Sequence, residues 1–327
     1  MHFSKIVLVG WIVFLVPFSS FCQEDATSRE LSSMVVVETR SPQLLSQVSP
    51  WVTIISSEEL KQRQIYFVGD ALRTVPGLAV VRSGQVGGQT SLFSRGAESN
   101  QVTFLLDGRK LNGGFSGQYN LGHLGMDGFS GLEVLRGSAS TLYGSEGAGG
   151  AVMLRSGQLP RQGIASSVGF SGGAYGTFRS DLQTTFRDQA WSGNLGVSSA
   201  TTENDRPNAD YQNVFGSFKL VRALPDGWSI DLVGMGYDVD MGVPGSLSFP
   251  SFSDSQQNEQ FLLSPGVSGG GDNWSMQFIY SFSSDEIVNA IGGNREADVL
   301  HGDQVDALWT WDVMDDLSLT VGGNYYE

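Results

Sequence analysis

The stretch that decides the fold of this chain reads Trp274-Ser275-Met276-Gln277-Phe278-Ile279-Tyr280-Ser281-Phe282-Ser283. An apolar side chain occupies every second position, and most of the positions between carry serine or glutamine. Because successive side chains of a β-strand point to opposite faces, the pattern predicts a strand with one apolar face and one small or polar face. Segments of about ten residues with this alternation are typical of transmembrane β-strands.

The same alternation extends in both directions along the chain. It returns in Val305, Ala307, Trp309 and Trp311, and again in Leu317, Leu319, Val321 and Tyr325. Counting from Ile164, we expect nine strands. Their short links are expected at 187–190, 225–227, 271–273 and 314–316, and their longer polar links near 203–210, 241–259 and 288–298, after a tight first link at 172–176. Short turns at one end and long loops at the other indicate an outer-membrane barrel rather than a soluble β-sandwich.

Tryptophans support the same interpretation. Trp191, Trp228 and Trp274 each follow a short turn, which places an indole at one membrane interface. Single-chain bacterial barrels have an even number of strands, and the sequence stops within a candidate strand at Tyr325-Tyr326-Glu327. We therefore expect residues 161–327 to be the first strands of a truncated antiparallel membrane β-barrel.

The N-terminal residues indicate export. Lys5 precedes an apolar run from Ile6 to Val16, which is long enough for a secretory signal peptide but too short to span a bilayer. We predict a signal peptide over residues 1–22, cleaved before Gln23. The mature chain would then contain no cysteine, because Cys22 is the one cysteine of the sequence.

Residues 23–45 are expected to form an N-terminal extension. Its β-branched cluster, Met34-Val35-Val36-Val37 followed by Glu38, stands in polar surroundings near the terminus. A buried edge strand is the ordinary interpretation of such a cluster. A strand offered to another protein is the alternative that its setting favours.

Residues 46–160 are predicted to form a separate α/β domain. We expect a strand at 52–55, a short helix capped by Ser56 or Ser57, and a second helical turn at 68–73 that stops at Pro76-Gly77. Asp107-Gly108, between Val102–Leu106 and Arg109–Leu111, predicts a tight hairpin. Further strands are expected at 132–135 and 151–154.

The composition excludes several functions. Acidic residues outnumber basic ones 34 to 19, which argues against a nucleic-acid binder. His123 and His301 are far apart and lack the spacing of metal ligands, and no recognisable catalytic motif is present. The glycines of 144–150 resemble a dinucleotide loop only superficially, because no long helix follows them. We therefore do not expect an enzyme.

Three motifs in order carry a family resemblance. They run from Asp70 to Leu78 (Asp-Ala-Leu-Arg-Thr-Val-Pro-Gly-Leu), from Ser91 to Asn112 (around Arg95-Gly96 and Leu106-Asp107-Gly108), and from Gly131 to Val152 (around Leu135-Arg136-Gly137 and Tyr143-Gly144). They resemble the plug motifs of TonB-dependent outer-membrane receptors, and within that family the cobalamin receptor type most closely. The resemblance implies a plug inside an antiparallel barrel of about 22 strands. It also implies location in the outer membrane of a Gram-negative-type cell, in contact with outer-membrane lipid.

The resemblance also implies roles for particular residues. Met34, Val35, Val36, Val37 and Glu38 would form the TonB box, disordered before it pairs with a strand of the inner-membrane TonB complex. Arg95 and Arg136 would latch the plug to glutamates of the barrel wall beyond Glu327, the alternative being two surface arginines. The function implied is TonB-dependent active uptake of a scarce nutrient, with a passive porin or a soluble exported β-protein as the alternatives from other classes.

The predicted ligand site lies on two plug loops, 83–89 and 113–120. The residues expected to contact the ligand are neutral hydrogen-bonding groups, one of them aromatic, namely Ser83, Gln85, Gln89, Ser116, Gln118 and Tyr119. We expect a cobalamin-like corrinoid, because an anionic ferric siderophore, which is the alternative, would draw several basic residues to the site. Asp238 and Asp240, beside loops that carry Asp205, Asp210 and Asp254, suggest a calcium site as an alternative to solvated acids. No other cofactor is expected.

Overall fold

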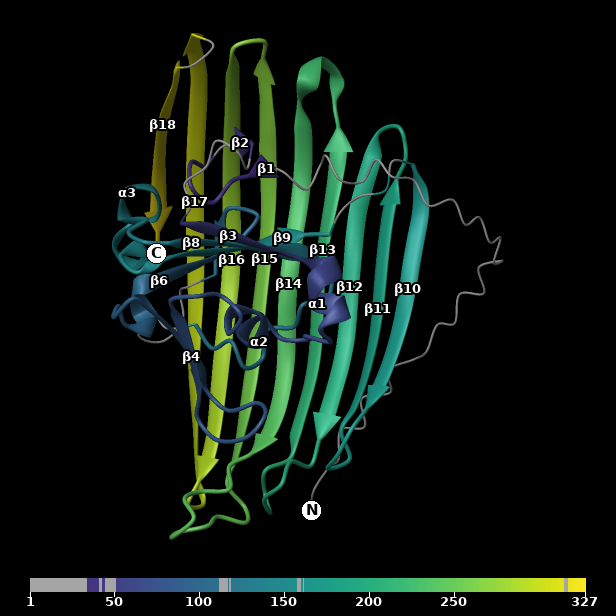
Figure 1. Cartoon of the computed structure of the whole chain (residues 1–327), viewed down its shortest axis with the longest axis vertical. Helices are drawn as coiled ribbons and strands as arrows, with labels where there is room; N and C mark the ends of the chain where they lie inside the picture. The colour runs from purple at the N-terminus through teal and green to yellow at the C-terminus, as the bar shows by residue number, and fades with distance from the viewer. Residues whose placement is uncertain are drawn as a thin grey trace.

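The structure has two layers: an α/β domain lies against one face of a tall antiparallel sheet (Figure 1). It is a computed structural model that describes residues 34–40, 43–44, 51–111, 117, 119–157, 160, 162–314 and 317–327. No helix among these residues is long and apolar enough to cross a membrane. We call the tall sheet the wall and the α/β domain the plug.

The wall contains nine strands in the described part of the chain, each hydrogen-bonded to the next in sequence order. The strands are β10 (Gly163–Gly172), β11 (Phe178–Arg187), β12 (Trp191–Thr202), β13 (Tyr211–Ala223), β14 (Ser229–Gly242), β15 (Ser255–Gly271), β16 (Trp274–Ile291), β17 (Asn294–Met314) and β18 (Leu317–Tyr326). All neighbouring pairs are antiparallel. The nine-strand prediction from Ile164 onward is confirmed.

The two faces of the wall differ as the alternation predicts. On β16, Met276 and Phe278 are exposed on the outer face, whereas Ile279 and Ser281 on the other face are buried. On β17, Trp309 and Trp311 are likewise exposed and Leu308 is buried. Apolar side chains on the face away from the plug are what contact with lipid requires.

The turns confirm most of the predicted asymmetry. The wall strands meet in short turns at one end, including Pro225–Gly227, and carry the longer connections 203–210 and 243–254 at the other. One prediction was wrong, because no loop occupies 288–298. There β16 and β17 continue to a two-residue turn at Gly292-Gly293, whose φ angles of 60° and 83° suit glycine.

The plug is built on a five-stranded sheet in the order β3-β8-β9-β6-β7, with a separate pair β4-β5. Its elements are β3 (Val52–Ser56), α1 (Ser57–Gln62), α2 (Val68–Leu72), β4 (Leu78–Arg82), β5 (Thr90–Ser94), β6 (Val102–Leu106), β7 (Arg109–Lys110), β8 (Phe129–Arg136), α3 (Ser140–Tyr143) and β9 (Gly150–Ser156). Strands β6 and β9 are parallel, and the other pairs of the sheet are antiparallel.

Local sequence explains these elements. The side chain of Ser56 accepts a hydrogen bond of 3.2 Å from the backbone N–H of Glu59, which caps α1 as predicted. Asp107 and Gly108 adopt φ angles of 48° and 86°, the left-handed geometry of a tight hairpin. The predicted helices and strands are present, whereas β4, β5 and α3 were not anticipated.

One apolar core joins the two layers. Leu72, Phe104 and Leu132 of the plug belong to the same buried cluster as Phe215, Val233 and Leu262 of the wall. Each such side chain contributes roughly 1.5–3 kcal/mol on full burial. The layers also approach closely at glycine: a Cβ placed on Gly196 of β12 would lie 2.2 Å from the backbone nitrogen of Gly128.

Candidate functional site

A polar cavity of about 180 Å³ lies between the plug and the wall, toward the end that carries the long loops. The plug side supplies Gln89, Tyr119, Asn120 and His123, and the wall side supplies Tyr237, Gln256, Asn258, Gln260, Asp285 and Ile287. Gln256, Asn258 and Gln260 reach it because alternate residues of β15 share one face. Carboxamides are the most frequent group in the lining, and no lysine or arginine is among these residues.

His123 organises the cavity from the plug side. Its side chain is fully buried, and its Nε2 lies 3.0 Å from Asn120 Nδ2 and 2.8 Å from Asn258 Nδ2. Two amide groups facing one ring nitrogen assign Nε2 as the acceptor and place the proton on Nδ1. Burial lowers the pKa of His123 to about 4, so the ring is neutral at physiological pH. Its Nδ1 has no hydrogen-bond partner among the described residues.

Tyr119 closes the cavity beside the histidine. Its hydroxyl donates a 2.6 Å hydrogen bond to Oε1 of Gln260 on the wall. Burial, and next the nearby Asp285 carboxylate, raise the pKa of Tyr119, so the phenol keeps its proton. Apart from the Asp285 carboxylate, the cavity presents neutral donors and acceptors, an arrangement that suits a ligand rich in amide or hydroxyl groups.

The predicted ligand residues divide into three groups. Gln89 and Tyr119 line the cavity, and their role in ligand binding stays a prediction. Ser83 and Gln85 lie on the same plug turn, where Gln85 Nε2 donates to the backbone oxygen of Gly242 on the wall at 3.4 Å. Ser116 and Gln118 lie outside the described residues.

Sequence reasoning missed the rest of the cavity. His123 was noted only for its lack of metal-ligand spacing, and the wall residues Gln256 and Asn258 were assigned to the polar link at 241–259. A usable signal was present, because Gln256, Asn258 and Gln260 repeat at period two directly before the apolar part of β15. Polar side chains at that period on a wall strand predict groups that face the lumen.

The segment predicted as the TonB box lies at the other end of the plug, near the short turns of the wall (Figure 1). Strand β1 (Met34–Val35) pairs with β2 (Gln43–Leu44). Val35 and Val37 are buried, and the backbone N–H groups of Val36 and Val37 donate to Oε2 of Glu133 at 2.8 Å and 2.9 Å. The hydroxyl of Tyr143 donates to the Val37 carbonyl at 2.9 Å.

The expectation that this segment is disordered before coupling was therefore wrong. Its apolar side chains join a small core with Leu105 and Met153 of the plug, and a fully buried carboxylate satisfies two of its backbone donors. Arg40, just after the segment, forms an ion pair of 2.5 Å with Asp306 of β17. The segment is docked on both the plug and the wall.

The predicted latch arginines contact the plug. The Arg95 guanidinium lies 4.3 Å from the centre of the Trp51 ring, and Arg136 donates to the backbone oxygens of Trp51 and Pro76 at 3.2 Å each. Their expected partners lie beyond Glu327, so the latch role of Arg95 and Arg136 stays a prediction.

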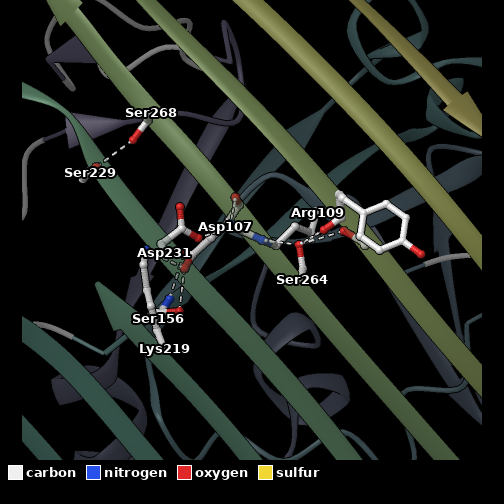
Figure 2. A network of polar contacts seen from close by, with 10 residues as sticks. Asp107, Arg109, Ser156, Lys219, Ser229, Asp231, Ser264 and Ser268 are labelled. Carbon is white, nitrogen blue, oxygen red and sulfur yellow. Dashed lines mark hydrogen bonds and ion pairs between the residues drawn. The ribbon is translucent and has the colours of Figure 1, made fainter. Parts of the chain in front are cut away.

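Other charged pairs hold the plug to the described wall, and sequence reasoning did not identify them. Arg109 of β7 pairs with Asp231 of β14, and Arg179 of β11 pairs with Asp127 of the plug. Lys219 of β13 pairs with Asp107 at 2.8 Å. Figure 2 shows the first and third of these pairs meeting at the Asp107-Gly108-Arg109 turn.

Asp238 and Asp240 point away from the plug. Both are exposed on β14, on the face opposite to the buried Val239, and Asp240 accepts a 2.6 Å hydrogen bond from Gln257. No group of three or more acidic, histidine or cysteine side chains that could hold a metal occurs in the described part of the chain. Calcium binding by Asp238 and Asp240 stays a prediction.

A plug seated on the inner face of an antiparallel wall, with lipid-type side chains outside, defines a plugged outer-membrane β-barrel. Residues 45–151 match the family described as TonB-dependent Receptor Plug Domain. Residues 45–151 therefore form a plug of the TonB-dependent receptor type, and the chain as a whole resembles outer-membrane transport receptors.

Two relatives refine this assignment. The chain is 24% identical over 335 residues to the vitamin B12 transporter BtuB of Vibrio vulnificus strain YJ016, covering 98% of this chain and 54% of that protein. It is 31% identical over 149 residues to the BtuB of strain CMCP6, covering 46% and 24%. The chain thus spans about half the length of the YJ016 relative.

Solved structures agree in fold. The ferripyoverdine receptor of Pseudomonas aeruginosa gives a TM-score of 0.74 at 14% identity, over 90% of this chain and 44% of that one. The ferric citrate transporter FecA in its unliganded form gives 0.71 at 15% identity, over 84% and 46%.

Proposed function

We propose that this chain serves TonB-dependent active transport of a scarce nutrient across the outer membrane into the periplasm, with a cobalamin-like corrinoid as the cargo. The observation that carries the proposal is the placement of two sites at opposite ends of one plug. A hydrogen-bonding cavity without lysine or arginine among its lining residues lies toward the long-loop end, and a docked β-branched segment lies toward the short-turn end. Energy supplied at one end can act on a ligand held at the other only if the plug couples them.

The chemistry of the cavity supports a corrinoid over a ferric siderophore. A corrinoid is fringed with amides, which match the carboxamides of Asn120, Asn258 and Gln260 as donors and acceptors. An anionic iron chelate calls for cationic partners, and the described lining residues include none. The relatives named as vitamin B12 transporters support the same choice.

The segment Met34–Glu38 is proposed as the TonB box. Its backbone already forms one short strand pair, and its remaining edge suits strand addition by a partner. Because the segment is docked against Glu133, it must be released before TonB can engage it. No bond of the cargo is made or broken in this cycle, so the protein acts as a transporter and not as an enzyme.

Equilibrium binding of the receptor purified from outer membranes tests the cargo. Cyanocobalamin is titrated with a catecholate iron complex as competitor, in wild type and in Asn258→Leu, which removes one amide from the lining. We expect tight cyanocobalamin binding that the competitor does not displace and that Asn258→Leu weakens. Tight binding of the iron complex with no measurable affinity for cyanocobalamin would refute the corrinoid proposal.

A further inference from the structure

A second and larger cavity lies along the same strip of wall, nearer to the short turns than the first. Its volume is about 620 Å³, and it opens among the short turns of β13 to β17. Val36 and Arg40 of the docked segment line it, together with Asp107 and Gly108 of the plug hairpin and Ser268 of β15. We call the cavity around His123, toward the long loops, the upper cavity, and this one, toward the short turns, the lower cavity; Figure 1 shows the wall with the long loops at the bottom.

The residues of β15 give the order of the two cavities. Gln260 lines the upper cavity, Ser264 comes four residues later, and Ser268 lines the lower cavity after four more. Each interval corresponds to about 13 Å of strand. Strand β14 repeats the order in the opposite chain direction, with Tyr237 above and Asp231 in the middle, and the turn residue Gly227 below.

Arg109 occupies the interval between the cavities. Its Nε donates to Ser264 Oγ at 2.9 Å, and its Nη2 pairs with Asp231, so one plug side chain bridges two wall strands (Figure 2). Ser264 in turn donates to the Tyr280 carbonyl at 2.7 Å and accepts from Ser281 at 2.8 Å. Arg109 is only 2% exposed, so its guanidinium is packed between the plug and the wall in this interval.

We propose that the Asp107-Gly108-Arg109 turn is the internal gate between the two cavities. When the turn withdraws, Asp231, Ser264 and Ser281 are left as a continuous hydrogen-bonding strip that joins the amides above to the serines below. Val36 and Arg40 line the lower cavity, so removal of the docked segment by TonB also widens the exit. The proposal rests on the proposed uptake function and assigns the route within it.

The closed gate is stable because its charges are paired away from water. Separating Arg109 from Asp231 leaves two buried charges unpaired, which is costly unless new partners replace them. A gate held by such a pair stays closed without an energy input and opens when the plug is pulled. Above it, Val233 and Leu262 pack against the plug core and contribute the apolar part of the seal.

The test measures ion conductance of the purified receptor in planar lipid bilayers. The double variant Arg109→Met/Asp231→Asn removes both charges and leaves neither unpaired. The matched control is Arg179→Met/Asp127→Asn, which removes a second buried plug–wall pair that lines neither cavity. Ser264→Ala is a milder third variant that deletes one acceptor of Arg109. Protection of the plug from trypsin verifies that it is seated.

We expect the Arg109→Met/Asp231→Asn receptor to conduct about tenfold or more above wild type, since opening its gate no longer separates a buried pair of charges. The conductance of the Ser264→Ala receptor should rise less, and the conductance of the matched control should stay at the wild-type level. Wild-type conductance in both gate variants, or an equal rise in the control, would overturn the gate. Neither readout needs cargo or TonB, so failure to bind cyanocobalamin would refute the proposed cargo separately.

Discussion

Replacing Glu133 with alanine is expected to release the docked N-terminal segment while the plug stays folded. The carboxylate is fully buried and accepts hydrogen bonds from the backbone N–H groups of Val36 and Val37 at 2.8 Å and 2.9 Å. A hydrogen bond to a charged group contributes about 1.5–3 kcal/mol, so the two together contribute about 3–6 kcal/mol to docking. Since 1.4 kcal/mol is a factor of ten, the undocked fraction should rise at least about a hundredfold.

Hydrogen exchange of the peptide that contains residues 34–40, followed by mass spectrometry, measures this fraction directly. Glu133→Gln is the graded variant, because its amide oxygen still accepts both bonds without charge, and we expect about a tenfold loss of protection. Glu59→Gln, in an exposed ion pair with Arg63 on α1, is the matched control and should change nothing. Unchanged exchange of residues 34–40 in Glu133→Ala, with the rest of the plug protected, would refute the idea that Glu133 holds the segment.

Three further predictions address the box, the interface and the cavity. Val36→Pro deletes the backbone N–H that donates to Glu133 and that strand pairing would need, so whole cells should lose uptake of radiolabelled cyanocobalamin while purified receptor binds it as before. Uptake at the wild-type rate would show that this segment is not the box. Gly196→Ala should destabilise the seating of the plug by about 1–3 kcal/mol in urea titrations, because the added Cβ would clash with the Gly128 backbone. Gly216→Ala, whose added Cβ would have its nearest neighbouring atom at 3.9 Å, should be tolerated, and equal urea midpoints in the two variants would contradict this. Burial lowers the pKa of His123 from 6.5 to about 4, so on acidification the unfolded chain binds a proton before the folded protein does, and the urea midpoint should fall as the pH drops from 6.5 toward 4. His123→Gln should remove this part of the pH dependence of the midpoint, and an identical pH dependence in both proteins would count against the burial of a neutral ring.

The wall was predictable because its cause is local. A lipid-facing strand must alternate apolar with small or polar side chains, so the residues from Trp274 to Ser283 identify the two faces of their strand without reference to neighbouring strands. The Asp107-Gly108 turn and the Ser56 cap are local in the same sense, since each depends on residues within three positions. The wrong loop at 288–298 shows the limit: polar strand residues near the long-loop end look the same in sequence as a polar loop.

The site was less predictable because its contacts join residues far apart in the chain. Val36 and Glu133 are 97 positions apart, and Arg109 and Ser264 are 155 apart. An isolated Val-Val-Val run therefore predicted strand propensity but not the carboxylate that caps it. Arg95, Arg136 and Arg109 all lie in the motifs, and nothing in the sequence showed that the fold buries Arg109 against the wall.

The charge state of the gate turn constrains how it can open. Burial by itself would raise the pKa of Asp107, but the Lys219 ammonium and two hydrogen bonds from Ser156 outweigh burial and hold the pKa at about 2. The carboxylate is therefore ionised at any pH that a cell surface ordinarily meets, and protonation cannot loosen the turn from Lys219. Ser156 follows Arg155, which is ion-paired at 2.9 Å with the same Glu133 that holds the docked segment. Strand β9 thus lies between the proposed TonB box and the turn proposed as the gate, and a pull on the box would reach the turn through Glu133, Arg155 and Ser156.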